Sequence, residues 1–170
     1  RSARVCRPGV APGPGVGGHC IAVDPWFVVA AAPEEARLIR QARITNDAKP
    51  NWVVSKVEAA AARLGRQPVI AALGLAFKAN IDDLRESPAV AIVERLSAKL
   101  DGAELLVVEP HVDRLPRQLA GLSNVVLKDL EPAVATADAV LLLVDHDDFR
   151  EMDRQLMAGK PVLDTRGIWQ

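Results

Sequence analysis

The feature that most constrains the fold is a series of short apolar segments that alternate with helical patterns from residue 68 onward. There are five such segments, at residues 69–73, 105–108, 124–127, 139–144 and 161–163. Nearly continuous runs of Val, Leu, Ile and Ala are typical of strands buried on both faces of a parallel sheet. Their alternation with helices predicts an α/β fold with a Rossmann-like, doubly wound parallel sheet of about five strands.

The helix after the first strand has the clearest boundaries. Ser87 is a good N-cap residue, Pro88 suits a first helical turn, and the pattern continues to Leu100 before the turn at Asp101-Gly102. Further helical stretches are expected at residues 114–120, 129–137 and 147–158.

The first third of the chain has a different pattern. Residues 1–18 are rich in Gly and Pro and predict a loop. One helix is expected from Pro33-Glu34 to about Asp47, and a second from Pro50 to a stop at Gly65. We therefore expect a division near residue 66, with a loop and helical segment at 1–66 and an α/β domain at 67–170.

Composition excludes several functional classes. A net charge of −1, 4% aromatic residues and no Tyr argue against nucleic acid as a partner. No apolar run is long enough to cross a membrane, and no signal peptide is recognisable. Two cysteines favour free thiols in the cytoplasm, although a Cys6–Cys20 bridge stays open. The start lacks a Met and enters loop-like sequence directly, which indicates a piece of a longer protein.

The glycine-rich loop before Cys20 contains an apparent dinucleotide fingerprint. Gly13, Gly15 and Gly18 match G-x-G-x-x-G, but no strand pattern precedes them and residues 20–25 have little helical character. The fingerprint requires both, so the match is not favoured. The glycines then either form a plain tight turn or let backbone N–H groups approach a ligand or an oxyanion.

Cys20 follows this loop directly and has two interpretations. A thiolate there can add to an aldehyde or an acyl carbon, and Asp24 is close enough in sequence to orient a water molecule. Alternatively, Cys20 is inert packing. Zinc binding by His19, Cys20 and Asp24 lacks a fourth ligand of suitable spacing, so no metal is expected. A Cys–His hydrolase would require His111 or His146 to approach the thiol.

Three cations follow predicted strands. Lys78 and Arg85 come after the first strand, and Arg166 comes after the last. The carboxyl ends of parallel strands are where α/β sheets bind anionic ligands. The alternative is that these side chains are simply solvated.

Taken together, these motifs resemble the UDP-glucose / UDP-N-acetylmannosamine (nucleotide-sugar) 6-dehydrogenase family. The matching pieces occur in the family's order and cover nearly the whole chain: GVGGHCIAVDP at 15–25, GLAFK at 74–78, DLRESP at 83–88, Asp138-Ala139 with HDDF at 146–149, and DTRG at 164–167. His19 and Val23 resemble the residues found at these places in the branch of the family that oxidises UDP-N-acetylhexosamines. Ala22 departs from the proline that is common there.

The resemblance implies an NAD-dependent, four-electron oxidation of a primary alcohol to a carboxylate, with UDP-N-acetylmannosamine as the expected UDP-sugar. Cys20 would form a thiohemiacetal and then a thioester, and Asp24 would activate water. Lys78 would contact the substrate near the reacting group, and Arg85 would hold the pyrophosphate of NAD. The remaining residues implied to line the nucleotide-sugar site are Gly15, Gly17, Gly18, Phe77 and Arg166.

The family's NAD-binding Rossmann domain has no counterpart in this sequence. We therefore expect the chain alone not to turn over NAD, and expect the helices at 34–64, part of the family's central dimerisation region, to form a homodimer in the intact enzyme. Two rival hypotheses remain, a non-catalytic nucleotide-sugar-binding or assembly module and a Cys–His hydrolase.

Overall fold

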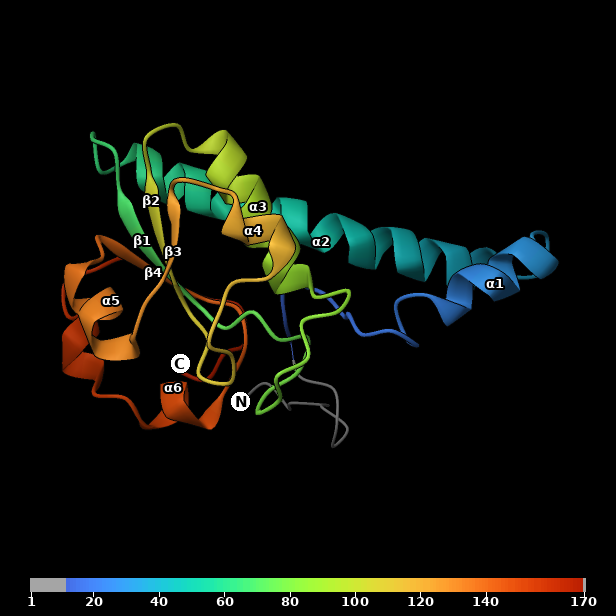
Figure 1. Cartoon of the computed structure of the whole chain (residues 1–170). Helices are drawn as coiled ribbons and strands as arrows, with labels where there is room; N and C mark the ends of the chain where they lie inside the picture. The colour runs from blue at the N-terminus through green and yellow to red at the C-terminus, as the bar shows by residue number, and fades with distance from the viewer. Residues whose placement is uncertain (1–11, 170) are drawn as a thin grey trace, which may run out of the picture.

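The computed structural model describes residues 12–169 and contains one five-stranded parallel sheet (Figure 1). The strand order is β3-β2-β1-β4-β5, with every neighbouring pair parallel. The strands are β1 (Val69–Leu73), β2 (Glu104–Val108), β3 (Val125–Leu127), β4 (Ala139–Leu142) and β5 (Val162–Asp164). The chain thus winds outward from β1 in both directions, which confirms the predicted doubly wound fold.

Helices cover both faces of the sheet, which explains why the strands are apolar on both sides. One face packs against α2 (Arg37–Ala62), α3 (Pro88–Lys99) and α4 (Arg117–Ala120). The other packs against α5 (Leu130–Thr136), α6 (Asp147–Glu151) and the 3₁₀ helix η1 (Arg154–Met157). Successive residues of β1 alternate between the two cores: Ile70 and Ala72 face α3, and Ala71 and Leu73 face α5.

The prediction of two helices at 34–64 is wrong, because α2 is a single helix of 26 residues with Pro50 inside it. Proline removes one hydrogen bond and crowds the preceding turn, yet a helix can continue where packing on both sides outweighs that cost. Here Val53, Val54 and Val57 are buried in the core of the α/β domain, and the amino-terminal half packs against α1 (Asp24–Ala31). Figure 1 shows α2 extending from the sheet to α1.

Two other expectations need correction. Residues 20–25 are more helical than expected, because they form turns that lead into α1, with Pro25 in its first turn. The helix expected at 147–158 is divided into α6 and η1. Asp153 has an extended backbone and accepts a hydrogen bond from the Gln155 amide (2.9 Å), so its side chain starts a new helical turn.

The helix at Ser87 forms as predicted. The Ser87 hydroxyl accepts a hydrogen bond from the amide of Ala89 (3.2 Å), and Pro88 occupies the first turn. Within residues 12–169, no helix combines the length and the apolar character needed to span a bilayer.

Candidate active site

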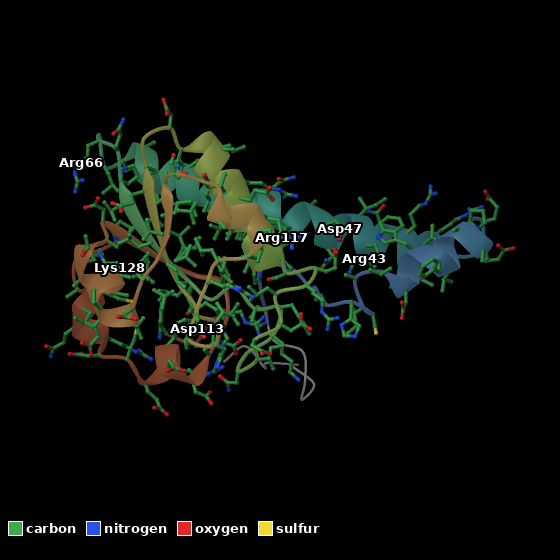
Figure 2. The ribbon with its side chains drawn as sticks, in the orientation of Figure 1. Arg43, Asp47, Arg66, Asp113, Arg117 and Lys128 are labelled. Atoms are coloured by element: carbon green, nitrogen blue, oxygen red, sulfur yellow. The ribbon has the colours of Figure 1, made fainter. Side chains whose placement is uncertain are left out.

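The glycine loop, residues 12–23, is fixed on one side by α2. The Asn46 side chain accepts a hydrogen bond from the Val16 amide (2.7 Å) and donates one to the Val16 carbonyl (3.1 Å). Arg43 donates to the Ile21 carbonyl (3.4 Å) and pairs with Asp47 (2.6 Å). Figure 2 shows Arg43 and Asp47 next to one another on α2. Helix α2 therefore fixes the backbone of the loop both before Cys20, at Val16, and after it, at Ile21.

On its other side the loop packs tightly against the segment between β1 and α3. A Cβ atom on Gly17 would overlap the Glu86 carbonyl oxygen and lie 2.6 Å from Cδ of Pro88. Gly18 has φ +92°, and a Cβ there would meet the Phe77 ring at 3.1 Å. These positions require glycine because of close approach within the protein itself. The loop and the α/β domain therefore form one continuous structure around residues 77–88.

Cys20 and Asp24 are brought together by a turn. The Cys20 carbonyl accepts hydrogen bonds from the amides of Val23 (3.1 Å) and Asp24 (2.8 Å), and Asp24 is the first residue of α1. Residues four apart in such a turn lie on the same side. Cys20 has a free, exposed thiol and the Asp24 side chain is also exposed. A thiol and a carboxylate four residues apart are thus both exposed to solvent at this turn.

The structure offers no histidine partner for this thiol. Among residues 12–169, no histidine forms a hydrogen bond with Cys20, and both ring nitrogens of His146 are bonded to other groups, the Asn80 amide and Glu109. No cluster of His, Cys, Asp and Glu side chains in the same range could hold a metal ion. Cys6, the other member of the possible Cys6–Cys20 bridge, lies outside the described residues.

A crevice at the edge of the sheet unites four of the predicted substrate-binding residues. Its walls include Gly15, Phe77, Lys78 and Arg166. Lys78 is exposed and forms no ion pair with any residue from 12 to 169. Its ammonium group is therefore available to an anionic ligand.

Arg166, in contrast, is already oriented. Its guanidinium is bonded to the carboxylate of Asp145 (2.7 Å) and lies against Gly13. Burial alone would raise the pKa of Asp145, but the charge of Arg166 and the hydrogen bond from Arg150 lower it on balance. Asp145 is consequently a carboxylate that fixes the direction of the Arg166 fork.

Arg85 lies apart from this crevice. Its guanidinium forms a fork with both carboxylate oxygens of Asp83 (2.6–3.1 Å) and lines a separate hollow with Pro116 and Gln118. The side-chain hydrogen bond from Arg85 is the main cause that lowers the pKa of Asp83 to about 2. The structure thus brings Lys78 and Arg166 together in one crevice, whereas Arg85 lines a different hollow.

Sequence reasoning missed the residues that support the site. Asn46 and Arg43 gave no signal, because a polar residue on a helix is ordinarily solvated. Glu109 did give one: an acid that directly follows an apolar strand lies at the ligand-binding edge of the sheet.

Comparison with known proteins gives the family. A model described as the UDP-binding domain of the UDP-glucose/GDP-mannose dehydrogenase family matches residues 71–170, which is more than half of the chain. The chain belongs to the UDP-glucose/GDP-mannose dehydrogenase family. A model of that family's central domain matches residues 2–48. The resemblance seen in the sequence motifs is therefore confirmed.

Individual relatives agree with this assignment. The chain is 58% identical over 158 residues to an NDP-N-acetyl-D-galactosaminuronic acid dehydrogenase of Ralstonia solanacearum, covering 93% of this chain and 36% of that protein. It is 51% identical over 166 residues to a UDP-N-acetyl-D-mannosamine dehydrogenase of Escherichia coli, covering 94% and 39%. The chain thus spans little more than a third of these relatives.

A solved structure shows the same fold. The UDP-D-ManNAc dehydrogenase of Pyrococcus horikoshii aligns with a TM-score of 0.74 at 30% identity, covering 95% of this chain and 38% of that one.

Proposed function

We propose that this chain is the cysteine-loop and UDP-binding portion of an NAD-dependent nucleotide-sugar 6-dehydrogenase that acts on a UDP-N-acetylhexosamine, with UDP-N-acetylmannosamine as the first substrate to test. The observation that carries the proposal is the packing of the glycine loop onto segment 77–88. This packing attaches the loop that carries the exposed Cys20 thiol to the segment that lines the crevice of Lys78 and Arg166. The relatives' names support the sugar class.

Two cations would bind the substrate. Lys78 is exposed and unpaired within residues 12–169, and Arg166 is pre-oriented by Asp145, so a phosphate or a sugar oxygen at the mouth of the crevice would meet one exposed and one fixed donor. The Phe77 ring packs on Gly18, which precedes the turn formed by residues 20–24. Binding at the crevice would therefore direct the sugar toward Cys20.

Cys20 and Asp24 would perform the chemistry on the aldehyde. The thiolate adds to the C6 carbonyl carbon, and the carbonyl oxygen takes up the proton, which gives a thiohemiacetal. Removal of a hydride from C6 and of the hydroxyl proton, with NAD as the hydride acceptor, would leave a thioester. Asp24, on the same exposed side, would orient water for attack on the thioester carbon, which releases the carboxylate and the free thiol.

Arg85 fits the role of a cofactor ligand. Its side chain is exposed, and the Asp83 carboxylate occupies one side of the guanidinium and fixes its plane. The other side is open to a pyrophosphate of NAD. When bound, NAD would supply the acceptor for the hydrides that leave C6.

The surface of α1 and α2 supports the expected homodimer. Phe27, Leu38 and Trp52 are all more than half exposed, and Val28 and Ile44 nearly so. Large apolar side chains gathered on one pair of helices are typical of an interface. We expect the complete encoded protein to sediment as a dimer in analytical ultracentrifugation, and expect Leu38→Glu to shift it toward the monomer. A monomeric wild-type protein would contradict this part of the proposal.

The function is tested by ligand binding and by turnover. We expect isothermal titration of UDP into the chain to show saturable binding that Lys78→Ala and Arg166→Ala each weaken at least tenfold. In the complete encoded protein, NADH should form with UDP-N-acetylmannosamine, and Cys20→Ala should abolish its formation. UDP-N-acetylgalactosamine is the competing substrate. Absence of UDP binding at millimolar concentration would overturn the proposal.

A further inference from the structure

Glu109 is a buried carboxylate at the end of β2 with an unusual set of partners. One of its oxygens accepts hydrogen bonds from the backbone amides of Leu75 (2.6 Å) and Ala76 (2.9 Å) and contacts Nε2 of His146 (3.2 Å). Burial would raise the pKa of Glu109, but these hydrogen bonds lower it on balance. The group is therefore charged at neutral pH, in a place where an unpaired charge would be very costly.

The partners of His146 determine its protonation state. Nδ1 accepts a hydrogen bond from the Asn80 amide (2.9 Å), so the ring proton is on Nε2 and is donated to Glu109. The ring is fully buried, with Phe149 packed edge-on at 5.3 Å and the His111 ring at 4.9 Å. His146 is thus a neutral imidazole in one tautomer, which joins a carboxylate to a backbone amide.

This chain of hydrogen bonds holds both ends of one short segment. Glu109 fixes the amides of Leu75 and Ala76, and His146 fixes the amide of Asn80. Asn80 has φ +59° and also forms two hydrogen bonds with Asp147, at 2.8 and 3.0 Å. Between these anchors lie Phe77, Lys78 and Ala79. The conformation of the residues that face the crevice is therefore set from both sides.

Stability alone does not explain the network. A buried ionic group in a core can often be replaced by apolar residues at little or no cost in stability. This network also joins the carboxyl ends of β1, β2 and β4, the edge where α/β sheets bind ligands, and it ends on the segment that carries Lys78.

We propose that Glu109, His146 and Asn80 are positioning residues that hold Phe77 and Lys78 in the conformation that binds the nucleotide sugar. The inference rests on the proposed function for the role of Lys78. It adds residues that touch no substrate and act only through the backbone of the 76–80 segment. The geometry of the crevice would then depend on an imidazole and a carboxylate that are both out of reach of solvent.

The test compares His146→Phe with His111→Phe. Phe places an aromatic ring at position 146 but can neither accept from the Asn80 amide nor donate to Glu109. The exposed His111 ring forms none of these hydrogen bonds, and His111→Phe keeps the backbone amide that donates to Glu109 (3.3 Å). We expect His146→Phe to increase hydrogen–deuterium exchange of peptide 76–80 at least tenfold and to weaken UDP binding at least tenfold. His111→Phe should change either quantity less than twofold.

A second pair keeps the test decisive if His146→Phe does not fold. Glu109→Leu leaves the Leu75 and Ala76 amides unpaired, whereas Glu109→Gln retains an acceptor oxygen for them. We expect a tenfold loss of UDP affinity for the leucine variant and recovery to within threefold for the glutamine variant.

The outcomes separate the two proposals. Unchanged exchange and unchanged UDP affinity in His146→Phe or Glu109→Leu would overturn the positioning role. Failure of the wild-type chain to bind UDP would instead contradict the proposed function, and the exchange of peptide 76–80 would still decide whether the network holds the segment.

Discussion

The packing of the glycine loop on the α/β domain can be tested with a single methyl group. In Gly17→Ala, the new Cβ would overlap the Glu86 carbonyl and lie 2.6 Å from the Pro88 ring. Neither neighbour can rotate away, because one is backbone and the other is a ring in the first turn of α3. Overpacking of this kind costs about 1–3 kcal/mol.

The matched control is Gly121→Ala. Gly121 has φ −92°, and a Cβ there would meet nothing within 4 Å. Both substitutions reduce the conformational freedom of the unfolded chain equally, so their difference isolates the packing term. At roughly 2–4 °C per kcal/mol for a domain of this size, we expect Gly17→Ala to melt about 2–12 °C below Gly121→Ala. Circular dichroism would measure both transitions.

A second assay follows the loop itself. In a Cys6→Ser background, the rate at which Cys20 reacts with Ellman's reagent reports on the conformation of the turn at residues 20–24. Gly17→Ala should change that rate severalfold, and Gly121→Ala should not. If both variants melt at the same temperature and react at the same rate, the loop does not pack against Glu86. The conclusion that this packing holds Cys20 near the crevice of Lys78 and Arg166 would then be wrong.

Three further predictions follow from local contacts. Ser87→Ala removes the N-cap of α3 and should cost about 1 kcal/mol, or roughly 2–4 °C in melting temperature, whereas Ser87→Asp should retain most of it. Arg85→Met should raise the pKa of Asp83 from about 2 toward 3.8, as measured by NMR titration; an unchanged value would contradict the fork. The pKa of Glu109 is lower in the folded protein than its ordinary value of 4.5. The charged side chain therefore stabilises the fold above pH 4.5, and this contribution is lost as the pH falls below that value. The melting-temperature advantage over Glu109→Gln should therefore shrink between pH 7 and pH 3, and a constant difference would refute the assignment.

The sequence alone determined the sheet and the start of α3. Short apolar runs that alternate with helical patterns, such as 69–73, are typical of strands in a parallel sheet, and all five predicted runs overlap a strand in the structure. Ser87 and Pro88 act on their own helix turn, and local chemistry of this kind is visible in sequence. The proximity of Cys20 to Asp24 along the chain is also visible in the sequence, whereas only the structure shows that the thiol is exposed.

Only the tertiary structure decided the rest, because those features depend on residues far apart in the chain. Pro50 predicted a break, yet contacts of Val53, Val54 and Val57 with the α/β core outweigh one lost hydrogen bond. Gly17 suggested a ligand-facing loop, but its neighbour is the Glu86 carbonyl. His146 suggested a possible base for Cys20, whereas Glu109 and the Asn80 amide occupy both its nitrogens. The sequence shows which functional groups a residue carries. Which group it contacts depends on the fold, because the strands that bring the partners to the same edge of the sheet are far apart in the chain.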